Sequence, residues 1–339
     1  MRTSDFDYDL PTEFIAQHPV KPRDHSRLMR LDRQTGDVEH HRFFDLPKLL
    51  HAGDLLVLNQ TRVLPARLLA RKQPGGGRVE LLLLKRMGER TWQVMVGGRG
   101  LSKGRKLRLD KDIEATIVAE LGGPKRLVKF GIPIEDSLDE IGHMPLPPYI
   151  TRPLSNSEEY QTTFSKQPGS AAAPTAGLHF TERIFNDLSE RGISTAFVTL
   201  HIGLDTFAPV REDDPSEHPI HSEWCSLTGQ VAEQLNKARA RGDRVIAVGT
   251  TAVRTLETAA LQSDPDRIQP FEGPTDLFIL PGYSFKVVDA MITNFHLPRS
   301  TLLMLVSAFA DRNTMLRAYD LAKDEGYRFY SFGDAMLIE

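Results

Sequence analysis

Four short segments of this 339-residue chain combine small residues, hydroxyl side chains and a histidine or an arginine. They are AAAPTAGLHF (171–180), TLHIGLDTF (199–207), VGTTAVRTLE (248–257) and TNFHLPRST (293–301). Small residues let the backbone approach a ligand closely, and imidazole can take or give a proton near neutral pH. We therefore expect these segments to contact a ligand.

The segment 248–257 is the clearest candidate for binding an anion. Its apolar, β-branched start predicts a buried strand that passes directly into a helix at Gly249, Thr250 and Thr251, where free backbone N–H groups attract negative charge. Arg254 in the first turn adds a positive charge. We expect a carboxylate or a phosphate here, although the glycine spacing is neither that of a P-loop nor that of a dinucleotide-binding loop. Ordinary helix capping by Thr250 or Thr251 is the alternative.

Two histidines, His179 and His296, sit beside apolar residues in small-residue loops. An imidazole in such a place can act as a general acid or base. A hydrogen-bonded core histidine is the competing interpretation for each of them.

A second group, His201, His218, His221 and Glu223, resembles a set of metal ligands. Zinc needs three or four converging ligands, but Pro219 separates the later histidines and the spacing matches no helix-borne zinc motif. We therefore expect acid–base or substrate-contact roles for these histidines, and no metal.

The composition predicts about two domains with ordinary globular cores, since 40% of the residues are apolar and 26% are charged. The first residues do not resemble a secretory signal, and the single cysteine, Cys225, cannot form an intramolecular disulfide. The longest uncharged apolar run, 301–310, is too short to cross a bilayer. We expect a cytoplasmic protein that does not enter membranes.

The charge is unevenly distributed along the chain. The net charge is -3, yet residues 62–108 contain thirteen lysines and arginines against two acidic residues. Such segregation creates a field that a polyanion can feel, although a merely solvated basic face is the alternative.

The basic stretch falls within short β-rich runs from 63 to 141, separated by glycine-rich turns, which predict a small antiparallel barrel or sandwich. A proline-rich segment, 144–154, marks the boundary. Afterwards helices and strands alternate, with helices at 181–192 and 252–262 and a strand at 275–280. This order predicts an α/β domain.

The same loops carry a close resemblance to a known family, the S-adenosylmethionine:tRNA ribosyltransferase-isomerases (QueA) of queuosine biosynthesis. The resemblance extends from Asp5 to Leu337. The matching blocks are DFDYDLPTEFIAQHP, SRLMRLDR, GDLLVLNQTRVLPARL, MPLPPYITR, AAAPTAGLHFT, TLHIGLDTFAPV, VGTTAVRTLE, ITNFHLPRSTLLMLVSAF and YRFYSFGDAML.

The resemblance implies transfer and isomerisation of the ribosyl group of S-adenosylmethionine onto 7-aminomethyl-7-deazaguanine at the wobble position of tRNA. The products would be epoxyqueuosine-tRNA, adenine and methionine. The implied partners are tRNAs with a GUN anticodon; S-adenosylmethionine is a consumed substrate, and no cofactor or metal is expected. We further expect a monomer.

The implied fold is an α/β-barrel-like main domain built from both ends of the chain, with a small antiparallel β-barrel inserted. We place the α/β catalytic domain at 1–61 and 150–339, and the basic, tRNA-contacting barrel at 62–149. Asp205 stands where the family usually has glycine, and HPIH (218–221) replaces a more usual His-x-Met-His.

The implied chemistry begins with removal of a proton beside the sulfonium and loss of adenine, which requires a base and an acid. The candidates are His179, His201, His221 and His296, with Glu223 or Asp334 able to orient one of them. Substrate-binding and tRNA-binding candidates complete the hypothesis. The former are Thr175, Ala176, Gly177, Gly249, Thr250, Thr251, Arg254 and Asn294, and the latter are Arg62, Arg67, Tyr149 and Arg152.

Four of these residues have more specific expected roles. Arg254 is expected to hold the methionyl carboxylate, and Tyr149 with Arg152 to stack on a base and bind phosphate, or else to pack the boundary. Asp334 has an alternative role as an ion-pair partner of Arg328 that pins the last strand. Two other classes of protein compete with the family: a metal-dependent hydrolase, and a non-catalytic RNA-binding module.

Overall fold

The computed structural model describes residues 1–203, 206 and 209–339. The chain divides into two compact units. The first comprises Met1–Arg62, Pro148–Gln167 and Ala173–Glu339, and the second comprises Val63–Pro147 and Pro168–Ala172. The expected domain limits, 1–61 with 150–339 and 62–149, differ from these units by one or two residues at the main boundaries and by Pro168–Ala172, which packs with the second unit.

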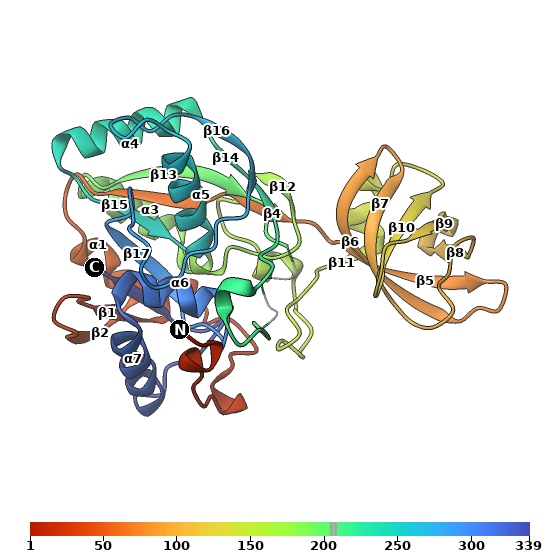
Figure 1. The fold of residues 1–339 in the computed structure, drawn as a ribbon, viewed down its shortest axis with the longest axis horizontal. Helices are drawn as coiled ribbons and strands as arrows, with labels where there is room; N and C mark the ends of the chain where they lie inside the picture. The colour runs from red at the N-terminus through yellow and green to blue at the C-terminus, as the bar shows by residue number, and fades with distance from the viewer. Residues whose placement is uncertain (204–205, 207–208) are drawn as a thin grey trace. The chain divides into compact units, whose positions relative to one another are not determined.

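The first unit is built on a nine-stranded mixed sheet with the strand order β16-β14-β13-β3-β15-β17-β18-β1-β2 (Figure 1). In chain order the strands are β1 (Arg27–Leu31), β2 (Val38–Arg42), β3 (Leu55–Asn59), β13 (Ser194–Leu200), β14 (Glu223–Leu227), β15 (Val245–Val248), β16 (Phe271–Thr275), β17 (Ala290–Asn294) and β18 (Ala335–Ile338).

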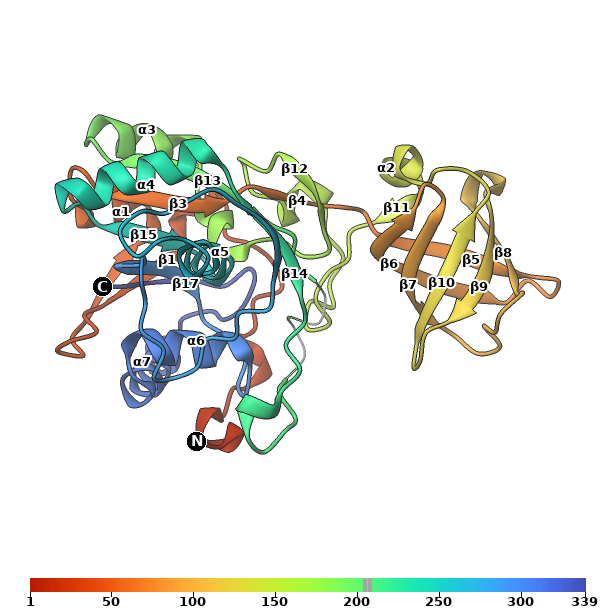
Figure 2. The ribbon, with the colours of Figure 1, turned by 45° about the horizontal axis from the view of Figure 1, so that its top comes forward.

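Helices cover both faces of this sheet (Figures 1 and 2). On β3, Leu55 and Val57 pack toward α4 to α7, whereas Leu56 and Leu58 pack toward α1 and α3, as the alternation of side chains along a strand requires. The helices are α1 (Leu46–Leu49), α3 (Glu182–Glu190), α4 (Gly229–Arg241), α5 (Thr250–Leu261), α6 (Thr301–Ala310) and α7 (Arg312–Asp324).

Four central strands of the sheet, β13, β3, β15 and β17, run parallel to one another. All residues of β3, β15 and β17 are buried, which explains their nearly continuous apolar sequences. Because parallel strands end at the same edge of a sheet, the loops that follow them meet there. Three of the four segments with chemically useful residues follow β13, β15 and β17.

The second unit is a closed antiparallel barrel (Figure 2). Six strands follow the order β5-β6-β7-β10-β9-β8, and pairing of β5 with β8 closes them; β11 adds to β5. The elements are β5 (Arg67–Gln73), β6 (Arg78–Gly88), β7 (Thr91–Gly97), β8 (Lys106–Leu109), β9 (Glu114–Glu120), β10 (Lys125–Phe130), α2 (Leu138–Ile141) and β11 (Gly142–His143). Two short strands at unit boundaries along the chain, β4 (Thr61–Val63) and β12 (Gln167–Ser170), pair with each other.

The predicted fold class, α/β with a small antiparallel β-barrel inserted between the two ends of the chain, is confirmed. The main domain, expected to be α/β-barrel-like, has a large mixed sheet whose described strands run in a linear order from β16 to β2. One predicted element is wrong. The apolar run 275–280 is not a strand, because β16 ends at Thr275 and the following residues form an irregular segment that packs on the core through Leu277, Phe278 and Ile279.

Candidate active site

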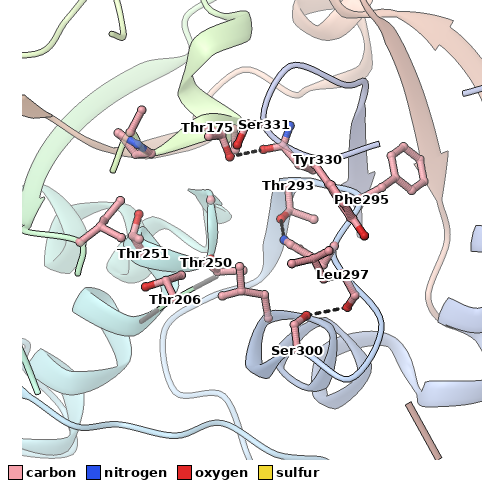
Figure 3. A pocket seen from close by; sticks show the side chains of 18 of the residues that line it. Thr175, Thr206, Thr250, Thr251, Thr293, Phe295, Leu297, Ser300, Tyr330 and Ser331 are labelled. Atoms are coloured by element: carbon pink, nitrogen blue, oxygen red, sulfur yellow. Dashed lines mark hydrogen bonds between the residues drawn. The ribbon is translucent and has the colours of Figure 1, made fainter. Parts of the chain in front are cut away.

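A pocket in the first unit lies at the edge where the parallel strands end (Figure 3). All four segments singled out in the sequence contribute to its wall, together with residues near 149 and 330. The wall is rich in hydroxyl groups and small side chains. It includes Ala173, Thr175, Ala176, Ile202, Gly249, Thr250, Thr251, Thr293, Asn294, His296, Ser300, Tyr330 and Ser331.

Helix α5 presents its N-terminus to this pocket. Gly249 precedes the helix with φ of +87°, a conformation that favours glycine. Its carbonyl accepts hydrogen bonds from Ala252 and Val253, and no side chain caps the helix in the described part of the chain. In this part of the chain the hydroxyls of Thr250 and Thr251 therefore do not cap the helix, which was the alternative to ligand binding. Gly249, Thr250 and Thr251 all line the pocket.

Arg254 does not line this pocket. It lines a neighbouring pocket, where its guanidinium pairs with the carboxylate of Glu223 and donates hydrogen bonds to the carbonyls of Leu277 (3.1 Å) and Thr275 (3.3 Å). The predicted anion site around the start of α5 is thus divided, with the helix N-terminus in one pocket and the arginine in the other. Glu223, expected to orient a histidine, instead binds Arg254 and the N–H of Gly203 (2.7 Å).

His296 is the one acid–base candidate histidine that lines the first pocket. It is 8% exposed, its Nε2 lies 3.1 Å from the hydroxyl of Thr293, and its Nδ1 lies 3.3 Å from that of Tyr319. Burial lowers its pKa to about 3. The imidazole is therefore neutral at physiological pH and can accept a hydrogen bond on its unprotonated nitrogen.

His179 lies behind the wall of the pocket. Its Nδ1 is 2.7 Å from the hydroxyl of Ser26, its Nε2 is 3.3 Å from the amide of Asn294, and its ring stacks on Phe43. Burial lowers its pKa to about 3, and the positive charges of Arg23 and Arg328 act in the same direction. This arrangement is that of a hydrogen-bonded core histidine, the alternative considered for it.

Asn294, at the end of β17, connects the pocket wall to the C-terminal segment. Its Oδ1 accepts a hydrogen bond from Thr175 (2.8 Å), and its amide approaches the carbonyl of Asp334 (3.4 Å). The side chain of Asp334 faces elsewhere. It accepts hydrogen bonds from the backbone of Arg27 and Arg328, both at 2.8 Å, and pairs with the Arg328 guanidinium. Among the described residues Asp334 therefore orients no histidine, and it pins the last strand, which was the alternative considered for it.

The other two histidines lie apart from the first pocket. His201 places its Nδ1 2.9 Å from the hydroxyl of Thr61 and stacks on Trp224, and burial lowers its pKa. His221 lines the same pocket as Arg254. Within residues 1–203, 206 and 209–339, no group of three or more His, Cys, Asp or Glu side chains is arranged to hold a metal ion.

Gly177 faces the core and not the pocket. A Cβ on it would come within 2.8 Å of Phe164 and 3.0 Å of Thr162, so its small size serves packing. Ala176, by contrast, lines the pocket on the 3-10 helix Thr175–His179. Asp205 lies outside the described residues.

The four tRNA-binding candidates have different surroundings. Arg62 forms an ion pair with Glu158 (2.5 Å), and Arg67 forms one with Glu80 (2.8 Å). The other two are Tyr149, which lines the first pocket with its hydroxyl 2.8 Å from Ser331, and Arg152, which is exposed.

Two groups of site residues were missed in the sequence. Tyr330 and Ser331 line the pocket, and Tyr330 has a φ of +69°. Both belong to the block YRFYSFGDAML, whose predicted roles fell on Arg328 and Asp334. Asn59 ends β3 and holds Leu200 at the end of β13 through two hydrogen bonds, and it also donates to Thr251. The signal for Asn59 was a polar residue after a buried apolar strand.

Comparison of the sequence with protein families and with individual proteins identifies relatives of this chain. A family model described as "Queuosine biosynthesis protein" matches residues 3–338. The chain belongs to this family. It is 50% identical over 343 residues to a protein of Desulfitobacterium hafniense, and 50% identical over 344 residues to one of Clostridioides difficile. Each match covers 100% of both chains, and both relatives are named S-adenosylmethionine:tRNA ribosyltransferase-isomerase.

A solved structure of the family is also similar. The crystal structure of the S-adenosylmethionine tRNA ribosyltransferase from Thermotoga maritima at 2.00 Å resolution superposes with a TM-score of 0.58. The two sequences are 40% identical, and the match covers 99% of this chain and 100% of that one. The family and enzyme class predicted from the sequence blocks are confirmed. No helix in the described part of the chain is long and apolar enough to span a membrane.

Proposed function

We propose that this chain transfers and isomerises the ribosyl group of S-adenosylmethionine onto 7-aminomethyl-7-deazaguanine at the wobble position of tRNA. The products are epoxyqueuosine-tRNA, adenine and methionine. The observation that carries the proposal is the convergence of the family's sequence blocks on one pocket, at the edge where four parallel strands end. Such an edge is where open α/β sheets bind their ligands.

The proposed chemistry requires a proton acceptor close to the reacting ribose. The sulfonium of S-adenosylmethionine acidifies the adjacent 5′ C–H. When a base takes this proton, the C–H electron pair stays on the 5′ carbon beside the sulfonium. We assign the proton acceptor to His296, because among the candidate histidines it is the one that lines this pocket. His179 and His201 support neighbouring loops, and His221 remains a candidate for contact with substrate from the second pocket.

The pocket wall is suited to a nucleoside. Thr175, Thr250 and Thr251 offer hydroxyl groups, and Gly249 and Ala176 add little bulk, so the backbone can lie close to a sugar or a base. We assign these residues, with Asn294 as the partner that holds Thr175, to substrate positioning. The reaction uses no resident cofactor or metal in this proposal.

For the RNA, we propose tRNAs with a GUN anticodon, bound through the phosphate backbone by the basic barrel. Tyr149 lies 4.7 Å from the ring of Tyr330, and both line the pocket, so they offer aromatic surface to an extruded base. Arg152 is exposed close by in sequence and can bind phosphate. We further propose that the protein acts as a monomer in the cytoplasm.

The direct test of the function is product formation. Protein treated with EDTA is incubated with S-adenosylmethionine and tRNA carrying 7-aminomethyl-7-deazaguanine, and nucleosides are analysed by mass spectrometry. We expect epoxyqueuosine with one adenine released per modified base. Absence of product despite tight tRNA binding would support a non-catalytic RNA-binding module, and activity restored only by zinc would support a metal enzyme.

Binding to tRNA is expected to weaken by about a hundredfold or more between about 50 and 200 mM salt, because neutralised phosphates release counterions. Arg71 and Arg78 are exposed cross-strand neighbours on the barrel. The double variant R71E/R78E should therefore bind tRNA more weakly and with a smaller salt slope. K237E is the control, a charge reversal at an exposed side chain on α4 in the first unit. Fluorescence anisotropy measures the affinity for tRNA and its dependence on salt. An affinity that does not change with salt would contradict the role of the barrel.

A further inference from the structure

The second pocket contains a buried pair of opposite charges that the proposed chemistry does not use. Arg254 and Glu223 have side chains that are 11% and 7% exposed, and both line this pocket. A buried ion pair contributes little net stability, since the loss of hydration offsets the attraction. Its position in a pocket wall therefore points to a ligand.

The two charged groups retain unused hydrogen-bonding capacity. Of the five guanidinium N–H donors of Arg254, three are directed to Glu223, Leu277 and Thr275 in the described structure, which leaves two. On Glu223, Oε1 accepts from Gly203 and from Thr206, whereas Oε2 accepts only from Arg254 in the described structure. Unused N–H donors of Arg254 thus lie next to an acceptor oxygen of Glu223. A zwitterionic ligand requires this arrangement, because its carboxylate needs donors and its ammonium group needs an acceptor.

Apolar side chains form the rest of the wall. Leu277, Phe278, Leu302 and Leu305 line the pocket. They suit an aliphatic chain that carries a charged end group. The imidazole of His218, which also lines it, is held by Glu212 at 2.7 Å.

The second pocket adjoins the first. Thr206 and Leu302 line both pockets. A ligand that places a nucleoside in the first pocket can therefore extend an aliphatic chain past Leu302 into the second. S-adenosylmethionine joins a nucleoside to an amino acid through such a chain.

We infer that the second pocket is the subsite for the amino acid end of S-adenosylmethionine, with Arg254 binding its carboxylate and Glu223 binding its ammonium group. The inference rests on the proposed function, and it names the residues that make the enzyme specific for its ribosyl donor. Recognition of both charges selects a zwitterion over an amine or an acid, because a missing group leaves a buried charge without a ligand partner.

The test compares two ligands in calorimetric titrations. S-adenosylhomocysteine carries the amino acid, whereas 5′-methylthioadenosine lacks it. Wild type should bind the former about tenfold to a hundredfold more tightly, the value of a hydrogen-bonded charge. R254K and E223Q should lose most of this ratio and leave the affinity for 5′-methylthioadenosine nearly unchanged.

Two further variants separate a subsite from a structural role. I220F adds bulk to the second pocket without altering the ion pair, and it should weaken only S-adenosylhomocysteine. R244K is the matched control, because Arg244 also pairs with a buried carboxylate, Asp54 at 2.7 Å, yet lines neither pocket; it should keep the wild-type ratio.

Three outcomes would overturn the subsite. They are equal binding of the two ligands by wild type, an equal loss for both ligands in R254K and E223Q, and an unchanged ratio in I220F. Turnover of wild type is measured in parallel. Product formation with an unaltered ligand ratio would reject the subsite alone, whereas absence of product would reject the proposed function.

Discussion

Lowering the pH from 7 to 5 is expected to reduce the free energy of unfolding by about 4 kcal/mol through His179 and His296 alone. Both imidazoles are buried, and the pKa of each is lowered to about 3. In the unfolded chain each has a pKa of about 6.5. The unfolded state therefore binds protons below about pH 6.5 while the folded state does not.

The sign follows from this difference. The stabilising contribution of each neutral imidazole is fully present above the unfolded pKa of about 6.5, and it is lost as the pH falls toward 3. Each histidine accounts for about half of the expected change. The lowered pKa of His201 acts in the same direction.

Urea unfolding at pH 7 and pH 5 measures the effect. In H179Q and in H296Q the difference between the two pH values should be smaller than in wild type by about 2 kcal/mol. Each variant is compared with wild type, so carboxylates that titrate in both proteins cancel. A variant with the wild-type pH dependence would show that its histidine is not held neutral in the folded protein.

H296Q is expected to lower the rate of adenine release by about a hundredfold to ten-thousandfold, the usual contribution of a positioned general base. Glutamine can keep a hydrogen bond to Thr293 but cannot accept a proton at neutral pH. The loss should appear in kcat, with a smaller change in the KM for S-adenosylmethionine. Single-turnover adenine release with saturating substrate and tRNA measures it.

H179Q is the matched control for this experiment. His179 has the same burial and the same lowered pKa as His296, but it binds Ser26 and Asn294 behind the wall of the pocket. The folded variant should therefore retain most of the rate. If H179Q were as slow as H296Q, the loss would come from displaced loops, and the assignment of His296 as proton acceptor would be wrong.

The secondary structure was largely predictable because its signals are local. The segments RLMRLD and DVEHHRFF around a short turn are typical of a hairpin and form β1 and β2, and the helical spacing of Val231, Leu235 and Ala238 before Gly242 is typical of a helix and lies in α4. The run 275–280 failed because an apolar segment can pack on a core without forming a ladder, and strand propensity depends strongly on context.

The sheet order was less accessible. Alternating strands and helices indicated parallel pairing, which holds for β13, β3, β15 and β17. The C-terminal strand β18, however, inserts between β17 and β1, antiparallel to the first and parallel to the second. That insertion joins residues about 300 positions apart, and no local pattern encodes it.

The candidate site likewise has features that the sequence predicted and features that only the tertiary structure revealed. Which residue types gather in the four loops could be read from the sequence, and the resemblance of nine blocks was enough for the family. The direction in which each side chain points could not be read from the sequence. Arg254 was expected to hold a carboxylate and His296 to act as an acid or base at the same site, yet of the two only His296 lines the first pocket.

Local sequence was thus sufficient for the elements, the segregation of charge and the family. Tertiary packing alone determined that Glu223 meets Arg254 and that the carboxylate of Asp334 accepts a hydrogen bond from the backbone of Arg27, 307 positions away, instead of meeting a histidine. The physical reason is that hydrogen bonds and ion pairs of buried groups form with whatever partner the packed sheet and helices bring within reach. That partner is set by the three-dimensional arrangement of distant segments, and not by spacing along the chain.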